Sequence, residues 1–371
     1  MTAKRGALAG GGEADVVVLG GGITGCAAAL ELVRDGRRVV VLEAGALGSG
    51  AAATDLGLVP LGLGVPYVQA VRRFGREGAR EVWETHRESQ SRLRELLASL
   101  GADCGYRQAG GFLMAEDRSE ALALADSEDL LREDAFAGEF LDHYMLESRF
   151  DVSGFSAAYW AAEEGEIDSR RLVQALAGAA TEGGAVFHEG SPVRELALTT
   201  SGAEAVTAGG RVHAPWAILA LGGAAPSLVP LLEGRIVAQE GERLALEPEP
   251  GAHLPTPART SGGGRAWRLG SDGLRMVLLG GTKAEDKGPK PGRLPVLPSP
   301  GARESVALDA SPDGFPSIGL LPGLPAAAAV GYGSLGHGYA LLAARWVAEA
   351  IRTGRDPTPR RYRADRARSQ V

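Results

Sequence analysis

The glycine-rich stretch at residues 15–25 constrains the fold of this chain more than any other feature. Residues 16–19 form a short β-branched run that suits a buried parallel strand, and the residues after the glycines carry Ala and Leu at helical spacing. The glycines therefore lie at a strand-to-helix turn, where Gly20 permits a tight bend, Gly22 lets the backbone approach a diphosphate and Gly25 lets helix and strand pack closely. The start of that helix offers unpaired N–H groups to phosphate charge. The pattern predicts a dinucleotide-binding βαβ unit, and a purely structural glycine turn is the alternative.

An acidic residue at the expected spacing strengthens this prediction. Residues 38–42 form a second apolar run, and Glu43 ends it about where a carboxylate accepts hydrogen bonds from both ribose hydroxyls. The same carboxylate would repel a 2′-phosphate, so the pattern favours a cofactor that lacks one.

Composition excludes several classes of protein. The 371 residues are enough for two interleaved domains, and 44% hydrophobic with 23% charged residues is typical of a soluble globular chain. A net charge of -7 disfavours nucleic acid as a partner. No segment is long and apolar enough to span a bilayer. Cys26 and Cys104 lack metal-ligand spacing and a secretory context, which favours a reduced, cytoplasmic setting, while the oligomeric state stays open.

The order of the predicted elements indicates an α/β fold: a discontinuous, Rossmann-like nucleotide-binding domain plus an α+β substrate domain with an antiparallel sheet. Both ends of the chain, residues 1–13 and the basic stretch 355–368, are interpreted as loose or solvated tails. The predicted nucleotide-binding domain takes residues 1–66, 151–230 and 310–371, and the substrate domain takes 67–150 and 231–309.

Local signals predict individual elements. Residues 67–100 form a helix ended by Gly101, 111–115 a strand, and 119–132 a helix capped by its first serine. Asp168 is placed to cap a helix over 169–182.

The second half of the chain carries two further glycine turns. Residues 193–198 and 211–214 are interpreted as hairpin strands, and 216–221 as a buried parallel strand that runs into a glycine turn. Residues 326–332 form a last strand, and the glycine-rich turn after it leads into a helix over 339–352. The start of that helix presents N–H groups and a positive dipole end, which suits a flavin.

Several motifs, taken in order, resemble the D-amino-acid oxidase and glycine/sarcosine oxidase superfamily of FAD enzymes. Besides the N-terminal fingerprint they are Glu166-Ile-Asp168, Ile218-Leu-Ala-Leu-Gly222-Gly, Pro312-Asp-Gly-Phe-Pro316-Ser-Ile-Gly319 and Gly331-Tyr-Gly-Ser-Leu-Gly-His-Gly338. The segment 83–115 is most similar to the amine-oxidising branch typified by γ-glutamylputrescine oxidase.

The resemblance implies a Rossmann-like FAD-binding domain and a non-covalent FAD, because neither cysteine lies where relatives attach the flavin. N–H groups aimed at the flavin would stabilise the negative charge that develops on it. The positions assigned to the cofactor are Gly20, Gly21, Gly22, Ile23, Thr24, Gly25, Glu43, Ala44, Ser49, Gly50, Ala51, Val193, Ala220, Gly222, Gly336, His337, Gly338 and Tyr339.

Departures from the family pattern bear on the substrate. The arginine that clamps a carboxylate in glycine and D-amino-acid oxidases is absent from the stretch 306–311, and the corresponding lysine of sarcosine oxidases is Ala340 here. A plain α-amino acid is therefore disfavoured, and a cationic or neutral amine, with Asp55 or Asp309 near its nitrogen, is favoured. Arginines of the predicted sheet are the alternative clamp: Arg259, Arg265, Arg268 and Arg275.

Four residues are the catalytic candidates: His337, Arg275, Asp55 and Tyr332. His337 is a possible base, although a histidine between glycines at a helix start is more often a hydrogen-bonding residue. Arg275 aligns with the lysine that helps oxygen react in sarcosine oxidases. Trp267, Tyr332 and Tyr339 could wall the pocket or pack in the core. No metal site is expected, because the histidines do not cluster.

The sequence therefore predicts an FAD-dependent oxidase that converts a primary or secondary amine to an imine by hydride transfer to the flavin, with O2 reduced to H2O2. Two alternatives stay open. One is a hydroxy-acid or alcohol dehydrogenase of the same fold that passes electrons to another acceptor. The other is a flavin-binding partner that has lost turnover.

Overall fold

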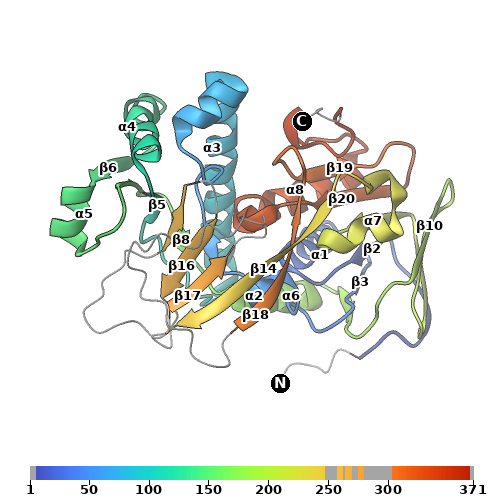
Figure 1. Cartoon of the computed structure of the whole chain (residues 1–371). Coiled ribbons are helices and arrows are strands. Elements are labelled where there is room, and N and C mark those ends of the chain that lie inside the picture. Colours follow the sequence, from blue (N-terminus) through green and yellow to red (C-terminus); the bar gives the residue numbers. More distant parts are fainter. Residues whose placement is uncertain (1–5, 247–256, 262–263, 270–274, 280–302, 368–371) are drawn as a thin grey trace.

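A computed structural model describes residues 6–246, 257–261, 264–269, 275–279 and 303–367 of the chain. In the described part of the chain, three large sheets, one two-stranded sheet and the helices that cover them form one two-part molecule (Figure 1). One part is built on a mostly parallel sheet and the other on a mostly antiparallel sheet, which confirms the predicted α/β class with a Rossmann-like domain and an α+β domain.

The parallel part is a six-stranded sheet in the order β19-β20-β13-β2-β3-β9. All neighbours in it are parallel except β19, which runs antiparallel to β20 at the edge. The Val-rich strands β2 and β3 are almost wholly buried, as expected for strands covered on both faces. The strands are β2 (Val16–Leu19), β3 (Val39–Leu42), β9 (Val186–His188), β13 (Trp216–Leu219), β19 (Ser317–Leu320) and β20 (Ala326–Val330).

Alternation along β2 divides the core into two layers. Val16 and Val18 pack into the cluster beneath the helices, whereas Val17 and Leu19 pack into a second cluster on the opposite face. The helices on the first face are α1 (Ile23–Arg34), α6 (Ser169–Glu182) and α8 (Gly336–Thr353), and α1 contacts both of the others.

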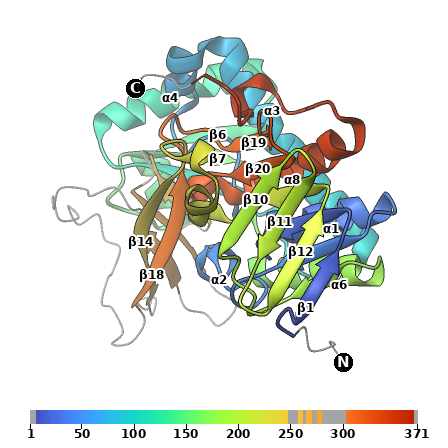
Figure 2. The same ribbon diagram turned by 90° about the vertical axis from the view of Figure 1, so that its right-hand side faces the viewer.

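A four-stranded sheet covers the second face, and Figure 2 shows its strands side by side. Its order is β1-β12-β11-β10, from β1 (Gly10–Glu13), β10 (Glu195–Thr199), β11 (Gly202–Val206) and β12 (Gly210–Ala214). Two predictions were wrong here. The first residues are not all a loose tail, because β1 pairs in parallel with β12 and Leu8 is buried. The predicted hairpin strands do not pair directly, because β11 lies between them.

The substrate part is an eight-stranded sheet in the order β18-β14-β17-β16-β15-β5-β7-β6, antiparallel except where β15 meets β5. The long strands β14 and β18 run side by side toward the parallel part (Figure 1). The strands are β5 (Gly111–Ala115), β6 (Gly138–Asp142), β7 (Ala157–Ala161), β14 (Val237–Leu246), β15 (Ala258–Thr260), β16 (Arg265–Leu269), β17 (Arg275–Leu279) and β18 (Arg303–Ala310).

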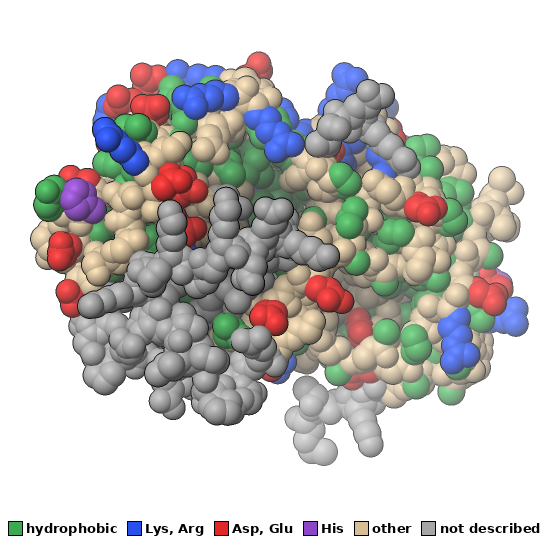
Figure 3. All heavy atoms as spheres, viewed as in Figure 1, with side chains coloured by type: hydrophobic (Ala, Val, Ile, Leu, Met, Phe, Trp, Pro, Cys, Tyr) green, Lys and Arg blue, Asp and Glu red, His purple; other side chains and the backbone are tan. Residues whose placement is uncertain are grey.

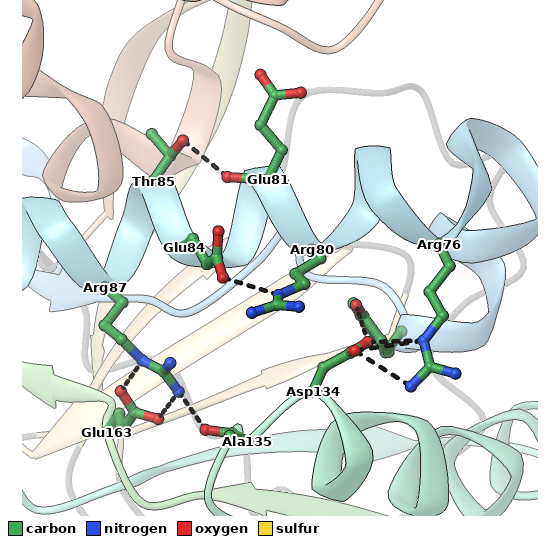
Figure 4. A network of polar contacts seen from close by, with 10 residues as sticks. Arg76, Arg80, Glu81, Glu84, Thr85, Arg87, Asp134, Ala135 and Glu163 are labelled. Carbon is green, nitrogen blue, oxygen red and sulfur yellow. Dashed lines mark hydrogen bonds and ion pairs between the residues drawn. The ribbon is translucent and has the colours of Figure 1, made fainter.

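Helix α3 (Tyr67–Leu100) lies between the two parts and contacts both α8 and α4 (Arg118–Glu133). Its bounds are those predicted, although Gly75 interrupts it with a φ of 74°. Figure 4 shows arginines of α3 reaching across to acidic residues: Arg76 binds Asp134, and Arg87 binds Glu163 at 2.6 Å. These pairs tie α3 to the short segments that directly follow α4 and β7.

The cap of α4 and the C-terminal stretch differ from the sequence expectation. Asp117, not Ser119, caps α4 by accepting the N–H of Glu120 at 2.9 Å. The C-terminal stretch was predicted to be a solvated tail, but as far as Arg366 it packs on the protein. Tyr362 and Ala364 are buried, and Arg366 pairs with Asp313 at 2.8 Å.

The remaining elements are short: α2 (Ala51–Thr54), β4 (Leu58–Val59), α5 (His143–Phe150), β8 (Gly165–Glu166), α7 (Ala225–Leu228) and the 3-10 turns Gly222–Ala224, Pro230–Leu232, Gly333–Leu335 and Arg360–Tyr362. Strand β7 falls in the range assigned to the nucleotide-binding domain but pairs with β5 and β6; the domain limits themselves stay a prediction. Within the described residues, no helix has the length and apolar character needed to cross a membrane.

Candidate active site

The ends of the parallel strands bring the predicted glycine turns to one edge of the sheet. Because β2, β3, β13 and β20 run the same way, the turns that follow them meet there. Direct contacts confirm the meeting: the N–H of Gly20 donates to the carbonyl of Leu42, and the N–H of Ala220 donates to that of Leu19, each at 2.9 Å. The hydroxyl of Thr24 donates to the Tyr332 oxygen at 3.2 Å.

The turn between β2 and α1 needs glycine at two places for packing alone. Gly20 has a φ of 107°, and a Cβ on it would lie 2.3 Å from the carbonyl oxygen of Ala220. A Cβ on Gly25 would lie 1.9 Å from the carbonyl oxygen of Gly20. Gly22 is different, because a Cβ added there meets no protein atom within 4 Å. Gly22 therefore faces open space at the start of α1.

Glu43 lies against this turn. One carboxylate oxygen accepts the N–H of Gly21 at 2.7 Å, and the other accepts the N–H of Gly45 at 2.8 Å. The side chain is partly exposed, so an acidic group stands at the tip of β3 beside the first turn.

Three helices begin at this edge with a glycine that faces open space: Gly22 before α1, Gly50 before α2, and Gly336 in α8. None of the three helices has a side-chain cap or an acidic residue in its first turn. Their first N–H groups are thus free of side-chain acceptors and offer positive ends to a ligand.

A close contact explains why Gly338, near the start of α8, is a glycine. His86 of α3 lies against it, and a Cβ on Gly338 would lie 2.6 Å from the His86 ring. His86 accepts the N–H of Gly62 through Nδ1 at 3.1 Å and packs edge-on against Tyr339. Burial, helped by the nearby cation of Arg259, lowers the pKa of His86 to about 3, so this ring is neutral and structural.

His337 and Asp55, both predicted as catalytic, are brought together by the fold. His337 Nε2 lies 3.1 Å from Asp55 Oδ2 and 2.8 Å from Ser169 Oγ, and the Ser169 hydroxyl donates to Asp55 Oδ2 at 2.8 Å. An ionised carboxylate only accepts, so Nε2 carries a proton, and Nδ1 is the acceptor of the neutral ring. Sequence reasoning missed Ser169, although it directly follows the predicted cap Asp168.

A cavity of about 230 Å³ opens beside this cluster, between the turn leading to β4 and the start of α8. Asp55 and His337 line it from one side, and strand residues of the substrate sheet line it from the other. Apolar side chains make up most of the remaining wall: Leu56, Leu58, Leu63, Ala266, Val306, Leu308 and Leu335.

Both arginines that line the cavity are already paired with glutamates. Arg259 makes two hydrogen bonds of 2.6 Å to Glu164, and both residues are buried. Arg265 pairs with Glu116. Arg268, outside the lining, donates to the carbonyl of Ile167 at 2.8 Å. Arg259 and Arg265 therefore present no unpaired cation to a substrate carboxylate, whereas Arg268 bonds a carbonyl and lies outside the lining. Sequence reasoning missed the two glutamate partners.

Asp309 lies between two of the glycine turns and not on the cavity. Its Oδ2 accepts the N–H of Gly331 at 2.5 Å, and its carboxylate carbon is 3.6 Å from the Cβ position of Gly222. Burial raises the pKa of this carboxyl to about 6.

The other candidates are placed as follows. Tyr332 bonds Thr24 and lines a neighbouring cavity, and burial raises the pKa of its hydroxyl. Trp267 and Tyr339 are fully buried and pack in the core. Arg275 begins β17, and its side chain lies outside the described part of the structure. Val193 lies between β9 and β10.

A ligand can reach the cofactor candidates that are partly or fully exposed. They are Gly22, Ile23, Glu43, Ala44, Ser49, Gly50, Ala51, Val193, Ala220, Gly222 and Gly336.

The arrangement fits a dinucleotide of the FAD type. The open space beside Gly22 at the start of α1 suits a diphosphate, and the Glu43 carboxylate beside it suits a ribose. The open start of α8 suits the electron-rich end of a flavin ring. Among the residues that the structure describes, no group of His, Cys, Asp or Glu side chains could hold a metal ion.

Replacing Gly22 tests this fit. Gly22→Val places its side chain where the protein leaves space, so the thermal unfolding of the cofactor-free protein should change little, whereas FAD binding should weaken about tenfold or more. Titration of cofactor-free protein with FAD, followed by flavin fluorescence, measures the second quantity. Gly11→Val, also beside open space but in β1 and outside the glycine turns, is the control for binding. Unchanged affinity in Gly22→Val would contradict the assignment.

The buried Asp309 predicts a pH dependence of stability. Because its pKa is about 6 in the folded protein and lower when unfolded, the folded state binds the extra proton. The free energy of unfolding should therefore fall as pH rises from about 4 to about 7, and Asp309→Asn should reduce this fall. Urea unfolding across that range measures it, with exposed Asp365→Asn as the control. Parallel curves for the wild type and Asp309→Asn would refute the role of Asp309.

Comparison with known proteins identifies the family. A model of the FAD dependent oxidoreductases (DAO) matches residues 15–350. The chain is 30% identical to the γ-glutamylputrescine oxidoreductase of Escherichia coli (strain K12) over 206 residues, 56% of this chain and 48% of that protein, so it spans about half the length of this relative. It is 25% identical to the glycine oxidase of Geobacillus kaustophilus over 310 residues, 71% of this chain and 74% of that protein.

The fold agrees with these matches. The crystal structure of the glycine oxidase from Geobacillus kaustophilus superimposes with a TM-score of 0.74 at 22% identity, covering 92% of this chain and 95% of that chain. Together with the family match over residues 15–350, which is most of the sequence, this settles the assignment. The chain belongs to the DAO family of FAD-dependent oxidoreductases.

Proposed function

We propose that this protein oxidises a primary or secondary amine that carries no carboxylate beside the reacting carbon. The amine loses two electrons and two protons and becomes an imine. O2 takes up both electrons and both protons and becomes H2O2, and water then hydrolyses the imine. When bound, FAD supplies the hydride acceptor. The relatives named for an amine and for glycine support oxidation of a carbon next to nitrogen.

The single observation that carries the choice of an amine over an amino acid is the pairing of the cavity arginines. A carboxylate needs an available cation inside a partly buried site, and Arg259 and Arg265 are both bound by glutamates. Asp55, whose side chain is 31% exposed, adds negative charge at the same cavity. The cavity therefore suits a substrate that is neutral or positive.

Asp55 and His337 have separate tasks in this proposal. The Asp55 carboxylate attracts the ammonium form of the substrate, and His337 Nδ1 takes the proton that leaves the nitrogen. The Ser169 hydroxyl holds Asp55 in place through its bond to Oδ2. A free lone pair on the nitrogen is what allows the neighbouring carbon to give up its hydride.

The cofactor is proposed to be held without a covalent bond. Neither cysteine forms a disulfide and both are buried. Cys26 lies within α1, and burial raises the pKa of the Cys104 thiol. The absence of a disulfide between the two cysteines also supports the proposed cytoplasmic location.

A substrate panel tests the proposal. Oxygen uptake should be seen with alkylamines and N-methylamines, and kcat/KM for the matching α-amino acids should be much lower. Glu116→Gln removes the partner of Arg265 at an exposed position, so kcat/KM for the amino acids should rise about tenfold while that for the amines stays level. Asp129→Asn, which releases an arginine far from the cavity, is the control. Preference of the wild type for α-amino acids or hydroxy acids would overturn the proposal.

The role of Asp55 has its own pH signature. Asp55→Asn should lower kcat/KM for an amine about a hundredfold near neutral pH, because the ammonium form predominates and needs a negative group. The difference in kcat/KM between the wild type and Asp55→Asn should narrow as the pH approaches the pKa of the amine. More of the substrate is then the free base, from which no proton has to be removed. Exposed Asp126→Asn serves as the comparison variant. A loss that stays constant across pH would assign Asp55 to structure alone.

A further inference from the structure

A second cavity, of about 340 Å³, adjoins the one that holds Asp55 and His337. It lies between the start of α3, the turn after β18 and the turn after β20. In Figure 3 this face of the molecule is indented between the part that carries α3 and the part that carries the C-terminal segments. The two cavities share five lining residues, Leu63, Gln239, Gly333, Ser334 and Leu335, so only these side chains and backbone separate them.

The second cavity contains a buried hydroxyl with no partner. Ser311 is 6% exposed, lines the cavity, and its Oγ has no hydrogen-bond partner among the described residues. A buried hydroxyl without a partner is costly, and native proteins usually satisfy it. The amides of Gln69 and Gln239 line the same space. These groups can all donate hydrogen bonds to an acceptor placed in the cavity.

The same cavity carries a cation that no carboxylate neutralises. Arg73 donates to the carbonyl oxygen of Asp313 at 3.3 Å and lies 5.0 Å from the centre of the Phe74 ring, with no ion pair among the described residues. The carboxylate of Asp313 also lines the cavity, but Arg366 binds both its oxygens at 2.8 and 2.9 Å. Arg73 is exposed, so it places a positive charge at the second cavity, where the first cavity has the negative charge of Asp55.

We propose that the second cavity binds a carboxylate at the far end of the substrate while the amine lies beside Asp55. This rests on the proposed amine oxidation and names its substrate class: an amine joined to a carboxylate by an aliphatic spacer. Arg73 and Ser311 bind the carboxylate, and Leu63 and Leu335, which line both cavities, contact the spacer. No cation then binds a carboxylate beside the reacting carbon, and Arg73 binds one at the far end of the substrate instead.

Kinetics with matched substrates test this. For the holoenzyme, KM should be lower for γ-aminobutyrate or one of its longer homologues than for the n-alkylamine of the same length. Arg73→Gln should raise that KM about tenfold with kcat unchanged, and Arg73→Lys should restore part of the loss. The KM for the n-alkylamine should not move. Arg72→Gln, the exposed neighbour that pairs with Asp126 outside the cavity, is the control. No preference in the wild type, or no effect of Arg73→Gln, would overturn the proposal.

A binding measurement separates this proposal from the proposed reaction. Calorimetric titration of the holoenzyme with hexanoate should show binding that Arg73→Gln and Ser311→Ala both weaken. If no amine is oxidised but hexanoate binding depends on Arg73, the amine chemistry fails and the carboxylate site stands. If amines are oxidised and hexanoate binds neither protein, the carboxylate site fails alone.

Discussion

The close contact between α1 and β2 is the constraint on which the rest of the site depends. At Gly25 the helix passes so near the carbonyl of Gly20 that no side chain fits, and Gly20 itself is pressed against Ala220 of the next strand. This packing fixes the position of the start of α1 relative to β2, and therefore the position of its free N–H groups. Gly22, between these two enclosed glycines in the sequence, faces open space.

Charge neutralisation inside the protein shapes the chemistry that the cavity can accept. Arg259 and Glu164 form a buried pair whose individual charges would each be costly to bury alone. Such a pair shows the substrate little net charge, and Arg265 with Glu116 does the same nearer the surface. What remains is the field of Asp55. In the proposed function, specificity depends on which charges have partners as much as on which residues are present.

Local signals in the sequence predicted the parts of the structure that depend on short range. The glycine turn, Glu43, the bounds of α3 and the cap at Asp168 each rest on a few neighbouring residues. Contacts between distant segments were out of reach: Ser169 meeting His337, and Glu164 meeting Arg259, are set by the packing of sheets and helices. Strand β1 was missed because glycines give no side-chain pattern, and only its backbone pairs with β12.

The two parts of the molecule alternate along the chain and contact each other closely. Ala310, the last residue of β18 in one sheet, forms a β-bridge with Tyr332, which follows β20 of the other sheet. No single cut in the polypeptide yields either half as a contiguous fragment. Truncation at one junction therefore cannot isolate either half.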